Sequence, residues 1–237
     1  MKATQRLLSI AIGAALAAAA SAALAAAGTV AQLSGTLSVK KPDGSVRILS
    51  QKSEVQNGDT LNTERDSYAQ IRFVDGAQMT MKPNTSIKLD DIRFTEDMQQ
   101  EDSFVFGLLK GGLRAVTGLV GKRSKDKYQV GTTTATIGIR GTTFSAEDCV
   151  SNREGECRRL DPAVYVTVSD GEVVLKNAQG EVGIAAGQFG LIAPNQRPLF
   201  LSTDPGLQFT PPATFIQSVM AGSAVNTGKN LECVVRK

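Results

Sequence analysis

Short stretches in which apolar and polar residues alternate run through most of this 237-residue sequence. Alternation places successive side chains on opposite faces of an extended chain, so each stretch is expected to form a half-buried β-strand. The clearest stretches are residues 36–39, 69–73, 78–81, 87–89 and 164–168. Turn signals such as Pro42-Asp43-Gly44 and Asp170-Gly171 separate them. Helical spacing is scarce, and the sequence therefore predicts an all-β fold.

The arrangement of these strands stays open between two architectures. A glycine followed by alternating apolar positions recurs at irregular intervals, for example at residues 35–39, 112–116 and 171–175. Such a pattern suits a sandwich of hairpins or a short β-roll that resembles a solenoid. The irregular spacing argues against a long regular solenoid. The stretch from Gln99 to Val120 lacks clean alternation, and we expect it to be irregular or briefly helical.

The two ends of the chain differ in composition from the centre. Residues 1–27 begin with basic residues, continue with an alanine-rich apolar stretch and end in small residues, which is the order of a secretory signal peptide. Cleavage is expected near Ala25–Ala27, with no integral membrane span afterwards and a periplasmic or secreted product. Residues 28–201 are expected to form one β domain. Residues 202–237, rich in Pro, Ala and Ser, are expected to be a poorly ordered tail outside the β core.

The amino-acid composition excludes several classes of protein function. The chain has no His and no Trp, which removes His-dependent nucleophile systems and His-ligated zinc, and weakens a sugar-stacking role. Lys and Arg number 26 against 23 Asp and Glu, a balance that argues against a dedicated nucleic-acid binder. No complete phosphate-loop or acyl-serine motif is present. We therefore expect no catalytic residues, no cofactor and no metal, and favour a non-enzymatic binding protein.

The three cysteines predict one disulfide. Cys149 and Cys157 flank a polar segment that contains a glycine, and in an oxidising compartment they are expected to close a small loop. The cysteines lack the paired spacing of a metal site. Cys233 is left over, either as a free thiol or as an alternative partner for one of the other two.

Two charged segments are expected to lie on the protein surface. An acidic stretch contains Asp90-Asp91, Glu96-Asp97 and Glu101-Asp102, without the spacing of a calcium loop, and is expected to be a solvated face. A basic run contains Lys122, Arg123, Lys125 and Lys127. Most such runs are exposed hairpin tips that keep a protein soluble. The functional alternative is a contact surface for an anionic partner.

The densest motif is residues 130–144, rich in Thr, Ile and Gly. Gly138 and Gly141 flank Ile139-Arg140, and glycines in a strand allow another backbone to approach closely. Arg140 is expected to be partly buried and paired with a carboxylate or carbonyl as an internal brace. The functional alternative for Arg140 is an anion ligand.

Several of these segments together resemble the FecR domain, a periplasmic module named after a regulator of iron-dicitrate uptake. Residues 58–63 are similar to its G-D-x-L-x-T element, Asp75-Gly76 to its D-G turn, and residues 130–144 to its most specific signature. The resemblance covers roughly residues 28–195. The positions that carry the signature are expected to be structural: Gly58, Asp59, Asp75, Gly76, Gly138, Arg140, Gly141 and Thr142.

The resemblance implies a fold and a compartment. FecR regulators carry a cytoplasmic anti-sigma segment and a membrane helix before this domain, whereas this sequence has a predicted signal peptide there. The leading interpretation is an exported, non-enzymatic module or scaffold that binds an envelope protein or an anionic cell-surface polymer. The alternative is a periplasmic sensor or regulator in a signalling or iron-uptake-type pathway.

Overall fold

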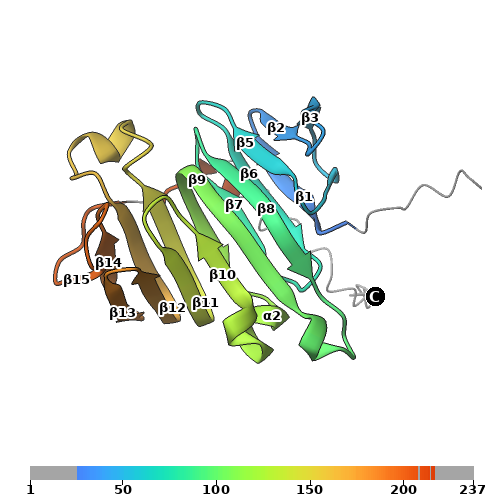
Figure 1. Ribbon diagram of the computed structural model, residues 1–237. Coiled ribbons are helices and arrows are strands. Elements are labelled where there is room, and N and C mark those ends of the chain that lie inside the picture. Colours follow the sequence, from blue (N-terminus) through green and yellow to red (C-terminus); the bar gives the residue numbers. More distant parts are fainter. Residues whose placement is uncertain (1–25, 208, 214, 217–237) are drawn as a thin grey trace, which may run out of the picture.

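The computed structural model describes residues 26–207, 209–213 and 215–216, and its strands join into one 15-stranded sheet (Figure 1). The all-β prediction is confirmed. The strands are β1 (Gly28–Ser34), β2 (Leu37–Lys40), β3 (Val46–Leu49), β4 (Glu54–Val55), β5 (Thr60–Thr63), β6 (Tyr68–Phe73), β7 (Gln78–Met81), β8 (Ser86–Arg93), β9 (Ser103–Val116), β10 (Tyr128–Gly131), β11 (Thr136–Asp148), β12 (Val164–Asn177), β13 (Gly180–Ala185), β14 (Phe189–Ile192) and β15 (Leu199–Leu201). Short helical elements join some of them: η2 (Gln99–Glu101), α2 (Leu119–Arg123), η3 (Lys125–Lys127) and η4 (Gly155–Arg158).

Strand β9 organises the N-terminal half because its two ends pair with different neighbours. Its first half lies between β8 and β10, and its second half lies between β7 and β11. Beyond β8 the sheet continues through β5 and β2 to β3, and beyond β7 it continues through β6 and β1 to β4. Two arms of one sheet therefore diverge from β9, and their buried side chains belong to one common core.

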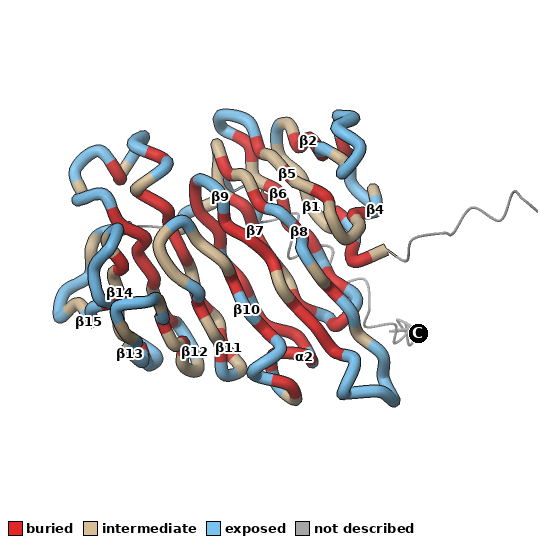
Figure 2. Tube along the Cα trace, in the orientation of Figure 1, coloured by how far each residue is buried: buried red, intermediate tan, exposed pale blue. Residues whose placement is uncertain are grey.

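Aromatic rings fill the part of this core beneath β9. Phe104 and Phe106 come from β9, Tyr128 from β10 and Phe73 from β6, and all four are buried. The Tyr128 ring stacks on Phe104 at 4.6 Å between centroids, and Phe73 meets Phe104 edge-on at 4.9 Å. These offset and edge contacts add to the stabilisation from burial. Figure 2 shows buried residues concentrated along β7 and β9.

The C-terminal half is built on two long strands. Strands β11 and β12 pair along most of their length, while β13 and β14 pair with successive parts of β12. Strand β15 then adds to β14. Alternate residues of β12 enter the core, which is the pattern that the sequence had indicated for residues 164–168.

The prediction of an irregular segment over residues 99–120 is wrong for most of its length. Only η2 and the start of α2 are helical there, and 14 residues between them form β9. Strand β9 has buried residues at adjacent positions because it pairs on both sides and is covered on both faces along part of its length. A strand in this position does not show period-two alternation.

The described part of the predicted tail contacts the sheet. Phe215 is only 4% exposed, and its ring centroid lies 5.9 Å from that of Tyr68 on β6. Leu207 packs against the small apolar cluster around Cys149, Cys157 and Tyr165. Phe215 is therefore an exception to the prediction that this segment contributes nothing to the core. We call residues 202–216 the strap.

Two further predictions concern the chain ends and the membrane. The predicted signal peptide lies outside the described residues except for its last two positions, as do residues 217–237 of the predicted tail. Within the described ranges, no helix combines the length and the apolar character needed to span a membrane.

Candidate partner-binding surface

The basic run lies in a crossover between parallel strands and does not form a hairpin tip. Strand β10 runs parallel to β9, with Tyr128 opposite Phe104. Parallel neighbours need a connection that returns the chain to the starting end of the sheet. Helices α2 and η3 belong to this connection, and they carry all four basic residues (Figure 1). The hairpin-tip expectation is therefore wrong, because the pairing direction of β10 could not be read from the local sequence.

Arg123 is fixed within the protein. Its Nε and Nη2 atoms each donate to the Asp102 carboxylate at 2.8 Å, and further N–H groups donate to the carbonyls of Glu96 and Thr95 at 2.9 and 2.6 Å. The guanidinium also lies 4.6 Å from the centre of the Phe94 ring. With its donors committed in this way, Arg123 is a brace and is not available to a partner.

Asp102 is the buried counterpart of this brace. It is 1% exposed and also accepts a hydrogen bond of 2.9 Å from the Ser124 hydroxyl. The hydrogen bonds from Arg123 hold the pKa of Asp102 below its usual value, although burial opposes this. The expectation that the whole acidic stretch is a solvated face is therefore wrong at Asp102.

The other three basic residues form an exposed cluster, which we call the lysine corner: Lys122, Lys125 and Lys127. Within the described residues none of the three forms an ion pair. In the part of the chain that the structure describes, their ammonium groups form one hydrogen bond, which Lys127 donates to the Gln100 carbonyl at 3.5 Å. Their charges therefore face solvent, on a backbone that Arg123 holds in place.

A groove of about 690 Å³ adjoins the lysine corner. Its floor is the outer face of β10, β11 and β12, where Gln129, Gly138 and Val174 stand in one row. Charged side chains border this floor: Lys125, Asp126, Arg140, Lys176 and Glu181. Because Gly138 has no side chain, the centre of the groove floor lies below its borders. These borders carry charges of both signs. A ligand in this groove could therefore form ionic contacts at the borders above a shallow floor.

Arg140 points outward into this groove. Its side chain is 57% exposed, and Nη1 lies 3.2 Å from Glu172 Oε2 on β12. Alternation along β11 explains the orientation, because Ile137 and Ile139 fill the core and leave Arg140 on the opposite face. The prediction of a partly buried brace is wrong, although the expected carboxylate partner is present.

The glycines beside Arg140 serve different purposes from the one predicted. An added Cβ on Gly138 would meet only the Val174 carbonyl, at 3.8 Å, so no backbone approaches closely there. Gly141 instead has φ +62°, a left-handed conformation that favours glycine. It lies in an irregularity where the pairing register of β11 and β12 shifts. The close approach occurs at Gly171, whose added Cβ would lie 3.1 Å from the Gly141 carbonyl carbon.

Thr142 holds this irregularity together. Its hydroxyl accepts from the Arg140 amide at 3.1 Å and donates to the Glu172 carbonyl at 2.9 Å. Its own amide donates to the Thr117 hydroxyl at 2.9 Å. These bonds satisfy backbone groups that the regular ladder leaves unpaired at the register shift.

The two aspartates of the signature organise turns. Asp59 is fully buried and accepts from the Gln56 amide at 2.9 Å, and the Lys41 ammonium lies 2.9 and 3.0 Å from its two oxygens. Its neighbour Gly58 has φ +85°, as the turn requires.

Asp75 connects the turn after β6 to α2. Its carboxylate accepts from the amides of Ala77 at 2.9 Å and Val120 at 3.3 Å, while its carbonyl accepts from the Leu119 amide at 2.9 Å. Burial raises the pKa of this carboxyl, and the backbone hydrogen bonds act against that rise. Gly76 follows with φ +82°. Asp75 therefore helps to fix the corner that carries the lysines.

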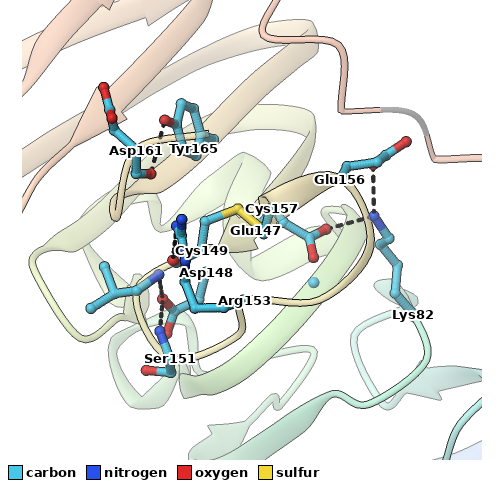
Figure 3. The surroundings of a disulfide bond; sticks show 12 residues. Lys82, Glu147, Asp148, Cys149, Ser151, Arg153, Glu156, Cys157, Asp161 and Tyr165 are labelled. Carbon is cyan, nitrogen blue, oxygen red and sulfur yellow. Dashed lines mark hydrogen bonds and ion pairs between the residues drawn. A yellow bond between two sulfur atoms is a disulfide. The ribbon is translucent and has the colours of Figure 1, made fainter. Parts of the chain in front are cut away.

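The predicted disulfide between Cys149 and Cys157 is confirmed, with Cα atoms 5.1 Å apart (Figure 3). Asp148 caps the start of the loop by accepting from the amides of Val150 at 2.8 Å and Ser151 at 3.0 Å. Cys233 lies outside the described residues. The part of the chain that the structure describes contains no group of His, Cys, Asp or Glu side chains placed to hold a metal.

The local sequence does not indicate a partly buried ion pair that lies beside the disulfide. Lys82 Nζ lies 2.7 Å from Glu147 Oε2 and 3.6 Å from Glu156 Oε2, and Figure 3 shows the ammonium between the two carboxylates. Burial raises the pKa of Glu147, while Lys82 acts against the rise. The nearest sequence signal is Gly112, whose missing side chain leaves room for both partners.

Comparison with solved structures gives weak similarities. Two crystal structures of a candidate anti-sigma factor from Parabacteroides distasonis are 15% and 13% identical, with TM-scores of 0.46 and 0.45. Each match covers 62% of this chain and only 60% of the other. A chain described as a cell surface anchoring domain is 25% identical, with a TM-score of 0.28, over 28% of this chain and 88% of its own length.

Comparison with sequence families gives a match over part of the chain. No curated protein matches the chain. The family model described as FecR protein matches residues 59–174. This range runs from Asp59, just before β5, into β12, and includes Asp75 and the segment from Gly138 to Thr142. Residues 59–174, just under half of the chain, therefore match the family described as FecR protein.

Proposed function

We propose that this protein is a non-enzymatic, exported binding module of the cell envelope, and that it holds an acidic partner at the lysine corner and the adjoining groove. FecR domains are periplasmic, which supports the compartment. The match to a family of regulatory proteins supports a role in binding, in place of catalysis. The partner is an envelope protein or an anionic cell-surface polymer.

One observation carries the proposal. Three exposed lysines, none with an ion-pair partner among the described residues, lie on α2 and η3 with Asp126 as the one acidic residue among them, and Arg123 and Asp75 fix this backbone. Exposed like charges repel one another and gain little from solvent alone. A partner carboxylate or phosphate would relieve that repulsion. Since the corner is already ordered, binding there would cost little conformational entropy.

The second candidate function is a periplasmic regulator that binds the same kind of partner in order to signal. The observation in its favour is the FecR match itself, because that family is regulatory. Both candidates require the partner to contact this domain. They differ in whether the contact changes with a stimulus, so comparing capture from stimulated and unstimulated cells separates them.

The experiment reverses the three charges and leaves Arg123 in place. Purified Lys122→Glu/Lys125→Glu/Lys127→Glu protein is used to capture partners from an envelope fraction, and captured proteins are quantified by mass spectrometry. The matched control is Lys52→Glu/Arg158→Glu/Arg159→Glu, which changes the net charge equally at exposed residues elsewhere. Thermal unfolding of all three proteins verifies the fold.

We expect the lysine-corner variant to lose partners that the wild type and the control both retain. Capture by the wild type should also weaken between 0.1 M and 1 M salt, because the Debye length falls from about 10 Å to about 3 Å. If the lysine-corner variant captures the same partners equally well at low salt, the proposal fails and the lysines only serve solubility.

A further inference from the structure

Strand β3 is an open edge of the sheet, and it lies away from the lysine corner (Figure 1). Among the described residues it pairs only with β2. Its residues Val46 and Ile48 are 64% and 68% exposed, the two highest values among the large hydrophobic residues exposed in the described chain. Open edges present unpaired backbone groups, and proteins usually protect them from pairing with other chains.

The register shows which backbone groups of β3 are free. The Lys41 amide donates to the Ser45 carbonyl at 2.8 Å, which makes these residues a hydrogen-bonded pair at the turn. Such pairs alternate along an antiparallel ladder, so Arg47 and Leu49 direct their backbone groups toward β2. Val46 and Ile48 consequently direct their N–H and C=O groups outward. The residues with exposed aliphatic side chains are the same ones that have free backbone groups.

Side-chain chemistry defines what could pair there. Val46 and Ile48 point to one face of the hairpin, whereas Arg47 points to the other and is exposed. Lys40 stands opposite Val46 on β2, also exposed. The nearest carboxylate in the hairpin, Asp43, is bound to the amide and hydroxyl of Ser45 at 2.9 and 2.6 Å. The edge is therefore aliphatic on one face and cationic around it.

We propose that β3 accepts an extended segment of a partner protein as an added strand. The segment would carry aliphatic residues at two alternate positions and an acidic residue between them, facing Arg47. Backbone hydrogen bonds to Val46 and Ile48 would supply affinity, and the alternating side chains would supply specificity. Cross-strand aliphatic contacts and opposite charges both stabilise such a pair.

A second copy of this chain fits the edge less well. In a two-fold antiparallel pairing centred on Arg47, each Val46 would meet an Ile48, but the two guanidinium groups would stand opposite each other. Like charges directly opposite are destabilising in a sheet. Arg47 thus works against self-association while favouring an acidic strand.

The test uses the full chain and a defined probe. A fluorescein-labelled pentapeptide of sequence Thr-Val-Glu-Val-Thr is titrated and followed by fluorescence anisotropy. A second pentapeptide with Lys in place of Glu is the matched control. Amide hydrogen exchange, measured by NMR with and without the peptide, reports the backbone contact. We expect the Glu peptide to bind at least tenfold more tightly than the Lys peptide, and to protect the amides of Val46 and Ile48 specifically.

Four variants separate the contribution of backbone pairing from those of charge and of aliphatic contact. Ile48→Pro removes an outward N–H without removing a bond to β2, which is the place where an edge strand tolerates proline, and it should abolish binding. Arg47→Glu should reverse the preference between the Glu and Lys peptides, while Arg158→Glu should leave it unchanged. A Val46→Thr/Ile48→Thr protein keeps β-branched residues at both positions and should weaken binding through the lost aliphatic contacts alone.

Three outcomes would overturn the proposal. The first is no binding of the Glu peptide, and the second is equal binding by the Ile48→Pro protein with its fold verified by thermal unfolding. The third is protection of Val46 and Ile48 that grows with protein concentration in the absence of peptide, which would assign the edge to self-association. This surface does not depend on the lysine corner, so either proposal can fail without the other.

Discussion

The absence of a side chain at Gly112 makes room for a neighbouring ion pair. An added Cβ would lie 2.7 Å from Glu147 Cδ and 2.9 Å from Lys82 Cδ. The partly buried Lys82–Glu147 ion pair occupies the space that this glycine leaves. Gly138 has no such neighbour, although both glycines lie in strand interiors with ordinary φ values. The two positions therefore form a matched pair for substitution.

We expect Gly112→Ala to lower the free energy of unfolding by about 1–3 kcal/mol, the usual cost of overpacking a filled site. Gly138→Ala should instead be neutral or stabilise by about 0.5–1 kcal/mol, because alanine loses less backbone entropy in a strand. Urea unfolding of both variants gives the comparison. Equal effects from the two substitutions would contradict the packing described around Gly112.

At the scale of elements, the crossover from β9 to β10 depends on contacts with a distant loop. Helices α2 and η3 are short, and short helices are marginal in isolation. Arg123 joins them to Asp102 and to the carbonyls of Thr95 and Glu96. The brace therefore determines whether the neighbouring lysines are presented in one arrangement or in many.

We expect Arg123→Ala to lower the melting temperature by several degrees, because Asp102 would remain buried without its cation. Lys122→Ala, one residue away and exposed, should have little effect. The pH dependence gives a second measurement. The lowered pKa of Asp102 means that its stabilising contribution is present above its unfolded value of about 3.8 and is lost as the pH falls below it.

The Arg123→Ala protein should lose part of this acid sensitivity, since the interaction that lowers the pKa is gone. Unfolding measured from pH 6 to pH 3 in both proteins tests the sign. A variant whose stability falls with acid as steeply as that of the wild type would show that Asp102 is held by other contacts.

At the scale of the whole molecule, the strap links the two halves of the sheet. It leaves β15 at one end, passes Tyr165 on β12 and reaches Tyr68 on β6, where Phe215 is buried. In Figure 1 it passes behind the sheet. Its described residues add no strand to the sheet after Leu201, so side chains such as Leu207 and Phe215 hold it in place. A segment held in this way can open without unfolding the sheet.

We expect Phe215→Ala to release the strap locally, so that limited chymotrypsin digestion cleaves after Leu207 or Phe209 about tenfold faster or more. Proteolysis follows the population of the open form, and about 1.4 kcal/mol of lost local stability corresponds to tenfold. The exposed neighbour Ile216 provides the control, since Ile216→Ala should leave the cleavage rate nearly unchanged. A rate for Phe215→Ala equal to that of the control would mean that Phe215 does not anchor the strap.

Local sequence was sufficient for features that depend on near neighbours. Alternation identified β6, β7 and the first part of β12, because one face of each strand must be apolar to meet the core. Turn residues such as Gly58 and Gly76 were found because positive φ values favour glycine. The disulfide followed from two cysteines separated by eight positions.

Only the tertiary structure determines which charged residues are held in ion pairs and which stay exposed to solvent. Arg123 and Lys122 are adjacent in sequence, but Asp102, 21 positions away, engages the first and leaves the second exposed. The same holds for Arg140, whose orientation follows from the face that β11 turns toward the core. Strand β9 escaped prediction because burial on both sides removes the alternation that marks a strand. Composition and motif spacing indicate which local structures a chain can form. The pairing of segments far apart in the sequence determines how deeply each side chain is buried and which charges surround it.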